Sequence, residues 1–416
     1  MKIYSPEYII DYARKHSPYY AGLYKKVSKN PALADLPLID QNHFWANASI
    51  KGGSVLTARQ VDGQVLKSGG TTGAPKYAPY TSEEWDTMCR INGFYLSKSG
   101  LKNGDRIANL FYGGGMYGSF IYVYSLLREA LSRTLLFNIG GQSPLEDMVS
   151  AIVNMEINVL AGIPSIILKI IEYVEKNSVE NFNVDVIYFA GETLYPDQRE
   201  AICSILGRKV DFRSVSLAGN DYGLVGYFSS DCGFNEHRVC DTACIFELID
   251  PDTNEVITEE NRIGKIYITS LYKLLMPLIR YPIGDMGMYT EPQGMPDRKF
   301  KLLGRSEEAA RIGVVSMYVT DVGRILNDLG ITVNGYQLIV SHTNKLDQLT
   351  IKISPRELNG KNKEDILEAL FKERPLFLDS LDKGIISPVE ITFCRMEDLE
   401  FNHRTGKLKS LIDLRF

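Results

Sequence analysis

Between residues 105 and 250, short apolar segments alternate with longer segments of helical periodicity. The apolar segments read RIANLF, RTLLFN, VLAG, VIYFAG and SVSLAG. The helical patterns cover residues 118–131, 144–155, 164–177 and 196–206. Strands that alternate with helices pair in parallel and are covered by those helices, so this order predicts a layered α/β domain.

Local capping patterns predict two helices before this region. The chain starts with a helix that Ser5 can cap, where Pro6 suits the first turn and Glu7 favours the positive end of the helix dipole. Thr81 followed by Glu84 forms a capping box for a second helix. Just before it, VDGQVLKSGG and KYAPY (76–80) predict two strands joined by a glycine-rich loop.

The sequence pattern changes twice after residue 250. KIYITSL (265–271) begins a β-rich part, and the pattern shifts again at LLGRSEE (302–308). Beyond it we expect strands near 337–341, 348–353 and 389–394 and helices near 319–329 and 363–372. The sequence therefore predicts a large layered α/β N-terminal domain, residues 1–303, and a small α+β C-terminal domain, residues 304–416.

Charge and hydropathy exclude several classes of protein. The net charge of −5 provides no basic footprint for nucleic acid. The apolar run FIYVYSLL (120–127) is far shorter than the ~18 residues of a membrane span, and MKIYSPEYIIDYARK lacks the apolar core of a signal peptide. Six cysteines in 416 residues do not suggest a disulfide framework, so we expect a reducing cytoplasm. We expect no nucleic-acid or membrane partner and leave a homodimer open.

The stretch SGGTTGAPK (68–76) has the composition of a phosphate-binding loop. Its glycines expose backbone N–H groups, its hydroxyls add donors, and Lys76 adds a positive charge. The order differs from the common P-loop, in which the hydroxyl follows the lysine. A flexible hairpin loop is the competing interpretation.

Three further segments could join such a loop in a nucleotide site. In RYPIGDMG (280–287), Asp285 could accept hydrogen bonds from a ribose diol, although a turn carboxylate would look the same. In GNDYGLVGY (219–227), Tyr222 offers a face for a base to stack on, although it could be a buried strand-end tyrosine. In RTGKLKSLIDLRF (404–416), a lysine lies on a glycine turn, although a solvated basic tail is the simpler alternative.

The order of these segments resembles the adenylate-forming (ANL) superfamily, and more closely its phenylacetate–CoA ligase-like branch. SGGTTGAPK resembles the superfamily's phosphate loop, and IYITSLYKLLMPLIRYPIGDMGMY resembles the segment that contains its ribose-binding aspartate. Further matches in the same order are ARKHSPYYAGLYKK, LADLPLID, AGIPS (161–165), AGETL (190–194), GRSEE (304–308) and RTGKLK. Each match is weak alone. Their shared order spans nearly the whole chain and supports the resemblance.

The resemblance implies a two-step reaction. A carboxylate attacks the α-phosphate of ATP, which gives an acyl-adenylate and pyrophosphate, and a thiol, usually of coenzyme A (CoA), then takes the acyl group. Such chemistry depends mostly on positioning and charge stabilisation. Mg²⁺ would accompany the phosphates, and the small C-terminal domain would be mobile between the two half-reactions.

The resemblance also implies roles for individual residues. Lys407 and Lys76 would be the catalytic cations, Asp285 would hold the ribose hydroxyls, Arg305 is a second candidate for the ribose or phosphate, and Glu307 would mark the hinge. Gly191, Glu192, Asn220, Asp221 and Tyr222 would frame the adenine. The remaining nucleotide-binding residues would be Ser68, Gly69, Gly70, Thr71, Thr72, Gly73 and Gly223.

A Gly/Tyr-rich stretch resembles the acyl-binding wall of that branch. Aromatic walls with small residues suit a flat aromatic acid, although these tyrosines could equally pack the core. The acyl-pocket residues would be Tyr112, Gly113, Gly114, Tyr117 and Gly162.

The chain departs from the family pattern at two places. The family motif Y-G-[LM]-[ST]-E, whose glutamate helps to hold Mg²⁺, ends here in Val225 and Gly226. Metal binding could therefore be weaker or come from Asp221 or Asp231, or adenylation could be impaired. In the strand after the hinge, Val314 aligns with the glycine that leaves room for the thiol tunnel, which puts the CoA step in doubt.

A cysteine-rich segment, CGFNEHRVCDTAC, spans residues 232–244. Soft ligands of this kind suit tetrahedral Zn²⁺, although their spacing is not the close C-x-x-C of a zinc ribbon. Reduced core cysteines beside a histidine are the alternative, and any zinc would be structural. The candidate ligands are Cys232, His237, Cys240 and Cys244.

Three functions are therefore open. The first is an AMP-forming ligase that joins an aryl or small carboxylic acid to CoA. The second keeps this chemistry but transfers the acyl group to a carrier-protein or other protein thiol. The third is a degenerate relative that binds nucleotide or acyl ligand without turnover, which Gly226 favours and the retained Lys76, Asp285 and Lys407 oppose.

Overall fold

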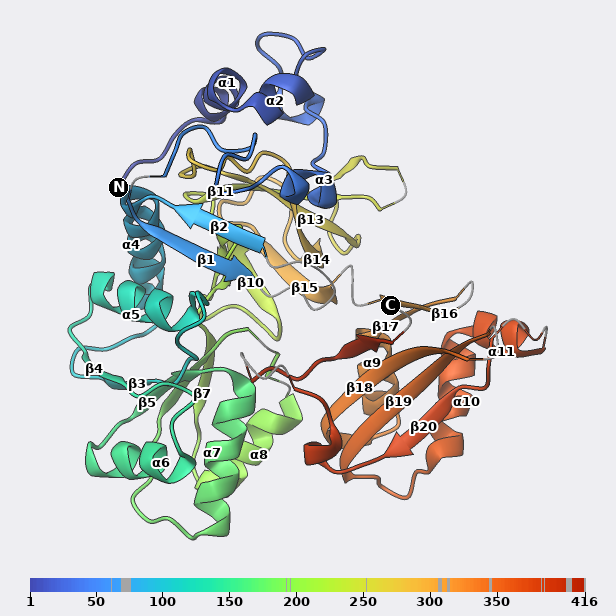
Figure 1. Ribbon diagram of the computed structural model, residues 1–416. Coiled ribbons are helices and arrows are strands. Elements are labelled where there is room, and N and C mark those ends of the chain that lie inside the picture. Colours follow the sequence, from blue (N-terminus) through green and yellow to red (C-terminus); the bar gives the residue numbers. More distant parts are fainter. Residues whose placement is uncertain are drawn as a thin grey trace. The chain divides into compact units, whose positions relative to one another are not determined.

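The computed structural model divides the chain into two compact units, Met1–Leu302 and Leu303–Phe416 (Figure 1). It describes residues 1–60, 62–68, 76–191, 193–194, 196–251, 253–305, 309–312, 315–343, 346–382, 384, 386–401 and 406–414. Each unit has its own buried core, and the two are described separately below.

The predicted alternation forms a five-stranded parallel sheet in the first unit. Its strand order is β4-β3-β5-β6-β7. The strands are β3 (Arg106–Asn109), β4 (Leu135–Asn138), β5 (Val159–Gly162), β6 (Val186–Phe189) and β7 (Asp211–Ser214). The helices between them are α5 (Ser119–Glu129), α6 (Leu145–Asn154), α7 (Pro164–Lys176) and α8 (Pro196–Leu206), which confirms the predicted α/β class.

The strand order reverses at β3. From β3 the chain moves outward to β4, then crosses back to β5 on the other side of β3 and continues to β7. In parallel sheets, ligands bind in the crevice beyond the carboxyl ends of the strands at such a reversal. The crevice between the ends of β3 and β5 is therefore the expected ligand position in this sheet.

One predicted strand is wrong. SVSLAG (214–219) was expected to be a single parallel strand, but β7 begins earlier, at Asp211, and ends at Ser214. The chain then leaves the parallel sheet, and β8 (Leu217–Gly219) pairs antiparallel with β9 (Gly223–Tyr227). The apolar run spans the passage from one sheet to the other, which periodicity alone cannot reveal.

An eight-stranded sheet forms the second part of this unit. Its order is β12-β11-β13-β14-β15-β10-β9-β8. Beyond β8 and β9 its strands are β10 (Glu236–Val239), β11 (Cys244–Ile249), β12 (Val256–Ile257), β13 (Gly264–Ser270), β14 (Tyr281–Tyr289) and β15 (Lys299–Arg305).

The N-terminal segment packs against the core of this larger sheet. Ser5 caps the first helix by accepting from the Tyr8 backbone N–H, and the Thr81–Glu84 capping box starts α4, so both capping predictions are confirmed. The elements are α1 (Pro6–His16), α2 (Pro18–Leu23), a 3₁₀ turn (Leu33–Asp35), α3 (Gln41–Ala46), β1 (Gln64–Ser68), β2 (Lys76–Tyr80) and α4 (Ser82–Lys98).

The second unit is a small α+β fold with a four-stranded sheet in the order β20-β19-β18-β21. Its strands are β16 (Ala309–Ile312), β17 (Val315–Tyr318), β18 (Thr332–Thr343), β19 (Leu346–Glu357), β20 (Glu390–Phe393) and β21 (Leu411–Asp413). Its helices are α9 (Val319–Asp328), α10 (Lys363–Glu373), α11 (Pro375–Asp382) and the 3₁₀ turn Met396–Asp398.

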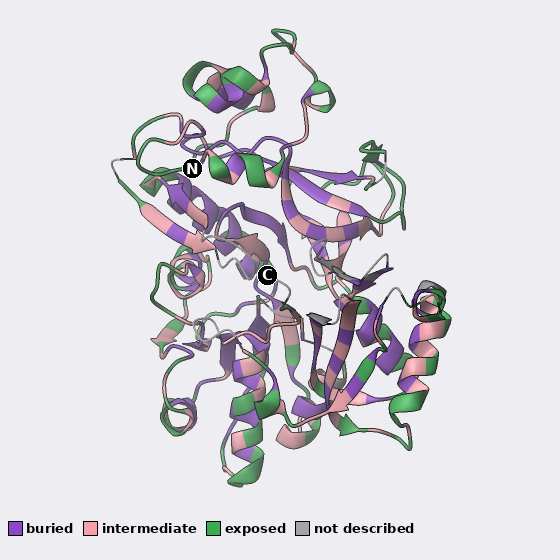
Figure 2. Cartoon of the chain, turned by 45° about the vertical axis from the view of Figure 1, so that its right-hand side comes forward, coloured by how far each residue is buried: buried purple, intermediate pink, exposed green. Residues whose placement is uncertain are grey.

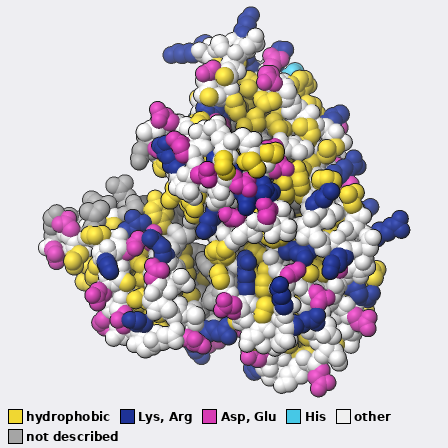
Figure 3. Space-filling model, turned by 180° about the vertical axis from the view of Figure 1, so that it is seen from behind, with side chains coloured by type: hydrophobic (Ala, Val, Ile, Leu, Met, Phe, Trp, Pro, Cys, Tyr) yellow, Lys and Arg dark blue, Asp and Glu magenta, His cyan; other side chains and the backbone are white. Residues whose placement is uncertain are grey.

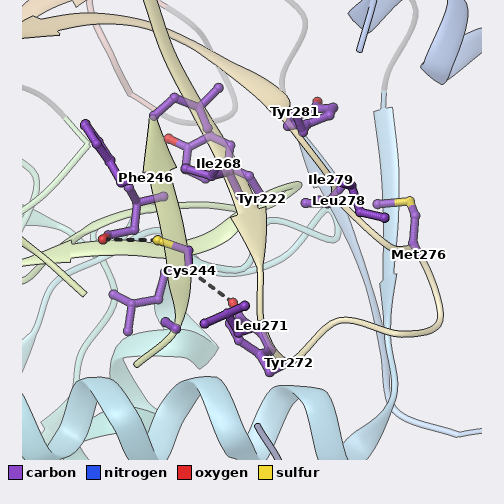
Figure 4. Close-up of a cluster of buried hydrophobic side chains, with 14 of the residues drawn as sticks. Tyr222, Cys244, Phe246, Ile268, Leu271, Tyr272, Met276, Leu278, Ile279 and Tyr281 are labelled. Atoms are coloured by element: carbon purple, nitrogen blue, oxygen red, sulfur yellow. Dashed lines mark hydrogen bonds between the residues drawn. The ribbon is translucent and has the colours of Figure 1, made fainter. Parts of the chain in front are cut away.

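Buried residues follow the strands and the inward faces of the helices (Figure 2). Figure 4 shows part of the larger core of the first unit, where Tyr222, Tyr272 and Tyr281 lie among aliphatic side chains. On the face drawn in Figure 3, acidic and basic side chains are interspersed. Among the described residues, no helix is both long and apolar enough to cross a membrane.

Candidate active site

The two ends of the glycine loop are held together by a strand pair. β1 and β2 are antiparallel, and their last register pair joins Ser68 to Lys76. The loop residues Gly69, Gly70, Thr71, Thr72 and Gly73 lie outside the described residues. The hairpin thus places both predicted ends of the phosphate loop side by side.

The turn that contains the predicted adenine-binding residues is bound to both strands of this hairpin. Asn220 Nδ2 donates to the Lys67 carbonyl of β1 at 2.9 Å. The Tyr80 hydroxyl of β2 donates to the Asn220 carbonyl at 3.0 Å. Segments 153 and 140 residues apart in the chain are therefore joined by hydrogen bonds, which hold the turn against the hairpin.

A fully buried lysine holds the next residue of this turn. Lys273 is 0% exposed, and its Nζ donates to the Asp221 carbonyl at 3.0 Å. The same Nζ lies 3.6 Å from the centroid of the Tyr80 ring, a cation–π contact. Burial lowers the pKa of Lys273 to about 8, and the nearby Glu84 and Asp221 carboxylates partly oppose this shift.

The glycine in the turn is required by its backbone conformation. Gly223 has φ +81°, which L side chains rarely adopt, and a Cβ there would lie 2.0 Å from the Tyr272 hydroxyl. That hydroxyl accepts from the Leu224 N–H at 3.1 Å, so it cannot move away without losing the bond. Tyr222 itself is buried at 5% exposure and belongs to the core.

The predicted ribose-binding aspartate lies in a β-bulge. Along the β13–β14 pair, Lys265 opposes Met286 and Tyr267 opposes Pro282, so residues 283–285 face the single residue Ile266. Gly284 takes φ +87° inside this bulge, and Asp285 follows it as a buried side chain. Bulges re-aim side chains and are common beside active sites.

The predicted acyl-pocket residues lie at the reversal point of the parallel sheet. The stretch with Tyr112, Gly113 and Gly114 follows β3, and Gly162 ends β5, the neighbouring strand. Tyr117 belongs to the same stretch, whose Met116 carbonyl accepts from the Lys67 N–H at 2.7 Å. The acyl stretch is thus bound to the strand that leads into the glycine loop.

The Gly/Tyr-rich stretch after β3, residues 112–118, also lies close to the adenine-motif turn. A Cβ on Gly118 would lie 2.8 Å from Asn220 Oδ1 and 2.9 Å from Leu66 Cδ1. Gly191, the first adenine-motif residue, follows β6 with φ +83°, and Glu192 lies outside the described residues. Within the first unit, the end of β1, the stretch 112–118 and the turn at Asn220 therefore lie together.

The position of the missing glutamate is crowded. Gly226 lies in β9, and a Cβ there would lie 3.0 Å from Phe300 Cζ and 3.1 Å from the Arg238 carbonyl. Phe300 is fully buried. The alternative carboxylate Asp231 forms ion pairs with Arg238 and Lys299, and the hydrogen bond from Arg238 holds the pKa of Asp231 well below its usual range.

The structure does not form the zinc site considered for the cysteine-rich segment. Among the described residues, which include all four candidates, no group of three His, Cys, Asp or Glu side chains could hold a metal. His237 Nε2 lies 2.9 Å from Ser214 Oγ. Burial raises the pKa of Cys240 to about 12 and that of Cys244 well above its usual value, because both thiols lie in the apolar core. Cys232 is half-buried.

Buried His237 should instead make the fold acid-sensitive. Burial lowers its pKa from 6.5 to about 4, so unfolding between these values takes up a proton and becomes easier as the pH falls. We expect the free energy of unfolding of the first unit to drop by about 2–3 kcal/mol from this group between pH 6.5 and pH 4. Urea unfolding across this range measures the drop, and His237→Gln should flatten it. Exposed His16 provides the control His16→Gln, which should keep the slope.

The last predicted residues belong to the second unit. Arg305 ends β15 and Glu307 lies outside the described residues. Lys407 is half-buried and follows Gly406, which has φ +68°. Phe401 and Leu408 form a β-bridge around this turn, which holds the base of the terminal lysine segment.

Comparison with solved structures shows which proteins share this fold. No protein-family model matches the chain. A solved structure of 2-hydroxyisobutyryl-CoA ligase, in the postadenylation state with R3-HIB-AMP, superimposes with a TM-score of 0.70 at 16% identity, covering 98% of this chain and 87% of that one. The chain therefore shares the fold of this CoA ligase.

Most of the sequence relatives of the chain are phenylacetate–CoA ligases. The phenylacetate–CoA ligase of Thermus thermophilus is 25% identical over 84% of this chain and 79% of its own length, and that of Aromatoleum evansii is 26% identical over 88% and 83%. The indoleacetate–lysine synthetase of Pseudomonas savastanoi is 25% identical over 60% of this chain and 58% of its length. The predicted resemblance is confirmed: the chain is a relative of the phenylacetate–CoA ligases within the adenylate-forming superfamily.

Sequence reasoning missed the polar residues that hold these motifs in place. Lys273 lies in the apolar run SLYKLLMPLI, where an isolated lysine could have indicated a buried cation. Glu84 was recognised only as a helix cap, but its Oε1 also accepts from the Leu274 and Leu275 N–H groups at 2.7 and 2.8 Å. Gln41 and Tyr281 carry no local pattern that would reveal their contacts.

Proposed function

We propose that this protein is an AMP-forming acid–thiol ligase. It would activate a small or aromatic carboxylic acid with ATP and transfer the acyl group to the thiol of CoA. The observation that supports this most is the set of hydrogen bonds that binds the Asn220–Asp221 turn to both strands flanking the glycine loop. The relatives named phenylacetate–CoA ligase support the same chemistry.

In the first step, a carboxylate oxygen of the acid bonds to the α-phosphorus of ATP while the bond to the bridging oxygen of the β-phosphate breaks. Pyrophosphate leaves with that electron pair. Lys76 and Lys407 would stabilise the negative charge, the loop Ser68–Gly73 would bind phosphates, and Asp285 would accept from the ribose hydroxyls. In the second step, the thiolate attacks the acyl carbon and AMP leaves.

The two units would divide this work. Residues 1–303 would bind ATP and the acyl substrate, and residues 304–416 would act as the mobile lid, with Glu307 at the hinge and Arg305 near the ribose or phosphate. Mg²⁺ would supply charge neutralisation on the phosphates. Gly226 replaces the expected glutamate and its surroundings are filled, so this position offers no carboxylate to hold the metal.

ATP–pyrophosphate exchange over a panel of small aromatic and aliphatic acids, with Mg²⁺, tests this function. Acid-dependent exchange is the expected result and would name the substrate class. A second assay would offer CoA, a pantetheine carrier protein and free lysine as acceptors, because one relative is named for joining indoleacetate to lysine. Absence of exchange with every acid, together with retained ATP binding, would favour a degenerate nucleotide-binding relative.

Asp285→Ala should weaken ATP binding. Loss of hydrogen bonds from the ribose hydroxyls to a charged group costs about 1.5–3 kcal/mol. Isothermal titration with ATP measures the change, and Asp185→Ala, which removes an exposed carboxylate paired with Arg208, is the matched control. Equal ATP affinity in the Asp285 variant would exclude it from the ribose site.

A further inference from the structure

Helix α3 presents two side chains to the lysine at the end of the glycine loop. Gln41 and Trp45 are four residues apart in this helix, so they share one face. Gln41 Oε1 accepts from Lys76 Nζ at 2.9 Å, and the same Nζ lies 5.8 Å from the Trp45 ring centroid. Asp40 caps the helix by accepting from the His43 N–H at 2.7 Å, which fixes its start.

The same two side chains converge on one buried hydroxyl. Gln41 Nε2 and Trp45 Nε1 donate to the Tyr281 oxygen at 3.1 and 2.8 Å. That hydroxyl donates its single proton to Asp221 Oδ2 at 2.9 Å. A hydroxyl has one donor and two acceptor positions, so all three are used and the direction of each bond is fixed.

Burial keeps this arrangement in one protonation state. Tyr281 is 0% exposed, and burial raises its pKa well above the usual value, so the hydroxyl remains a donor. Asp221 is 6% exposed. Its carboxylate accepts the hydrogen bond from the Tyr281 hydroxyl, and its backbone carbonyl accepts from Lys273 Nζ. Gln41 Nε2 also donates to the Pro282 carbonyl at 3.1 Å, which anchors the amide on strand β14.

We propose that Gln41 and Tyr281 are positioning residues of the adenylation site. Gln41, on α3, fixes the position of the Lys76 ammonium. Tyr281 connects Gln41 by hydrogen bonds to Asp221 in the adenine-motif turn. The relay runs from Lys76 to Gln41, Tyr281 and Asp221, across segments 35, 240 and 60 residues apart. The inference rests on the proposed function because it concerns the nucleotide that this site would bind.

The consequence is that Gln41 acts through Lys76. If the Gln41 amide oxygen increases ATP affinity by orienting the Lys76 ammonium, it can do so only in a protein that keeps Lys76. A residue that merely supports the fold would lower ATP affinity by the same factor whether or not Lys76 keeps its charge. A double-mutant cycle separates these two cases.

The test is ATP titration calorimetry on the full chain with Gln41→Met, Lys76→Met and both together. Gln41→Met keeps the side-chain length and removes both polar atoms. We expect it to raise the Kd for ATP about tenfold when Lys76 is present, the loss of one hydrogen bond to a charged group. In the Lys76→Met background the same substitution should change the Kd much less.

A second pair of variants tests Tyr281 independently. Tyr281→Phe keeps the ring beside Phe44 and removes the hydroxyl. Tyr20→Phe is the matched control because its buried hydroxyl donates to the Pro277 carbonyl and takes no part in the contacts from Lys76 to Asp221. Tyr281→Phe should weaken ATP binding and should not add to Gln41→Met, whereas Tyr20→Phe should leave the Kd unchanged.

The outcomes are separable. Equal Kd ratios for Gln41→Met in the two Lys76 backgrounds, or equal effects of Tyr281→Phe and Tyr20→Phe, would overturn the positioning role and leave the proposed function standing. A parent protein that binds no ATP would overturn the proposed function and the relay with it. Unfolding temperatures of all variants, measured in parallel, identify any variant that has lost its fold.

Discussion

Lys407→Ala should form almost no acyl-adenylate while binding ATP nearly as well as the parent protein. The lysine is proposed to stabilise charge that develops only as the carboxylate attacks the α-phosphate, so its loss acts on the transition state more than on the bound substrate. Removing one such preorganised charge contact lowers a rate by roughly 10²- to 10³-fold. Acid-dependent ATP–pyrophosphate exchange measures the rate, and calorimetry measures ATP affinity.

Two controls make this result specific. Lys409 lies two residues further along and its Nζ pairs with Glu400 at 3.1 Å, so Lys409→Ala removes a nearby lysine with a structural partner and should retain exchange. Transfer from supplied phenylacetyl-adenylate to CoA should also persist in Lys407→Ala, because adenylation is bypassed. An unchanged exchange rate in Lys407→Ala would exclude this lysine from the first step.

The fold could be predicted where local pattern and global position agree. VLAG and VIYF are continuous apolar runs because β5 and β6 are buried on both faces in the interior of a parallel sheet. The prediction of one strand for SVSLAG was wrong because this apolar run contributes residues to two sheets. No local periodicity marks the residue at which the chain passes from one sheet to the other.

In the candidate site, too, the sequence predicted the residues that belong to local motifs and missed those whose contacts are long-range. Motif order predicted Lys76, Asp221 and Asp285 as site residues, because the resemblance assigns those residue types to particular positions in the chain, and their roles stay predictions. Gln41 and Tyr281 could not be found this way, since their contacts join segments up to 240 residues apart and depend on how α3 packs against β14. The zinc hypothesis failed for a related reason: close spacing in the chain did not place the four side chains around one point.

The second large effect concerns the motif position that departs from the family. If the space around residue 226 were open, Gly226→Glu would restore the family's metal-binding carboxylate and strengthen the dependence on Mg²⁺. The structure predicts the opposite. A Cβ at Gly226 already presses on Phe300 and on the Arg238 carbonyl of the paired strand, and Phe300 is itself packed against Phe246 with ring centroids 4.5 Å apart.

Gly226→Glu should therefore destabilise the first unit without increasing exchange. Overpacking and an unpaired buried carboxylate together should lower the free energy of unfolding by at least about 3 kcal/mol, whereas Gly226→Ala should cost about 1 kcal/mol. Gly22→Glu is the control, because a Cβ on this exposed helix glycine meets nothing within 4 Å. Urea unfolding and Mg²⁺ titration of exchange measure both effects. A stable Gly226→Glu protein with tighter Mg²⁺ dependence would show that Phe300 moves aside. In that case the glycine would be a lost ligand rather than a position that this core requires to be small.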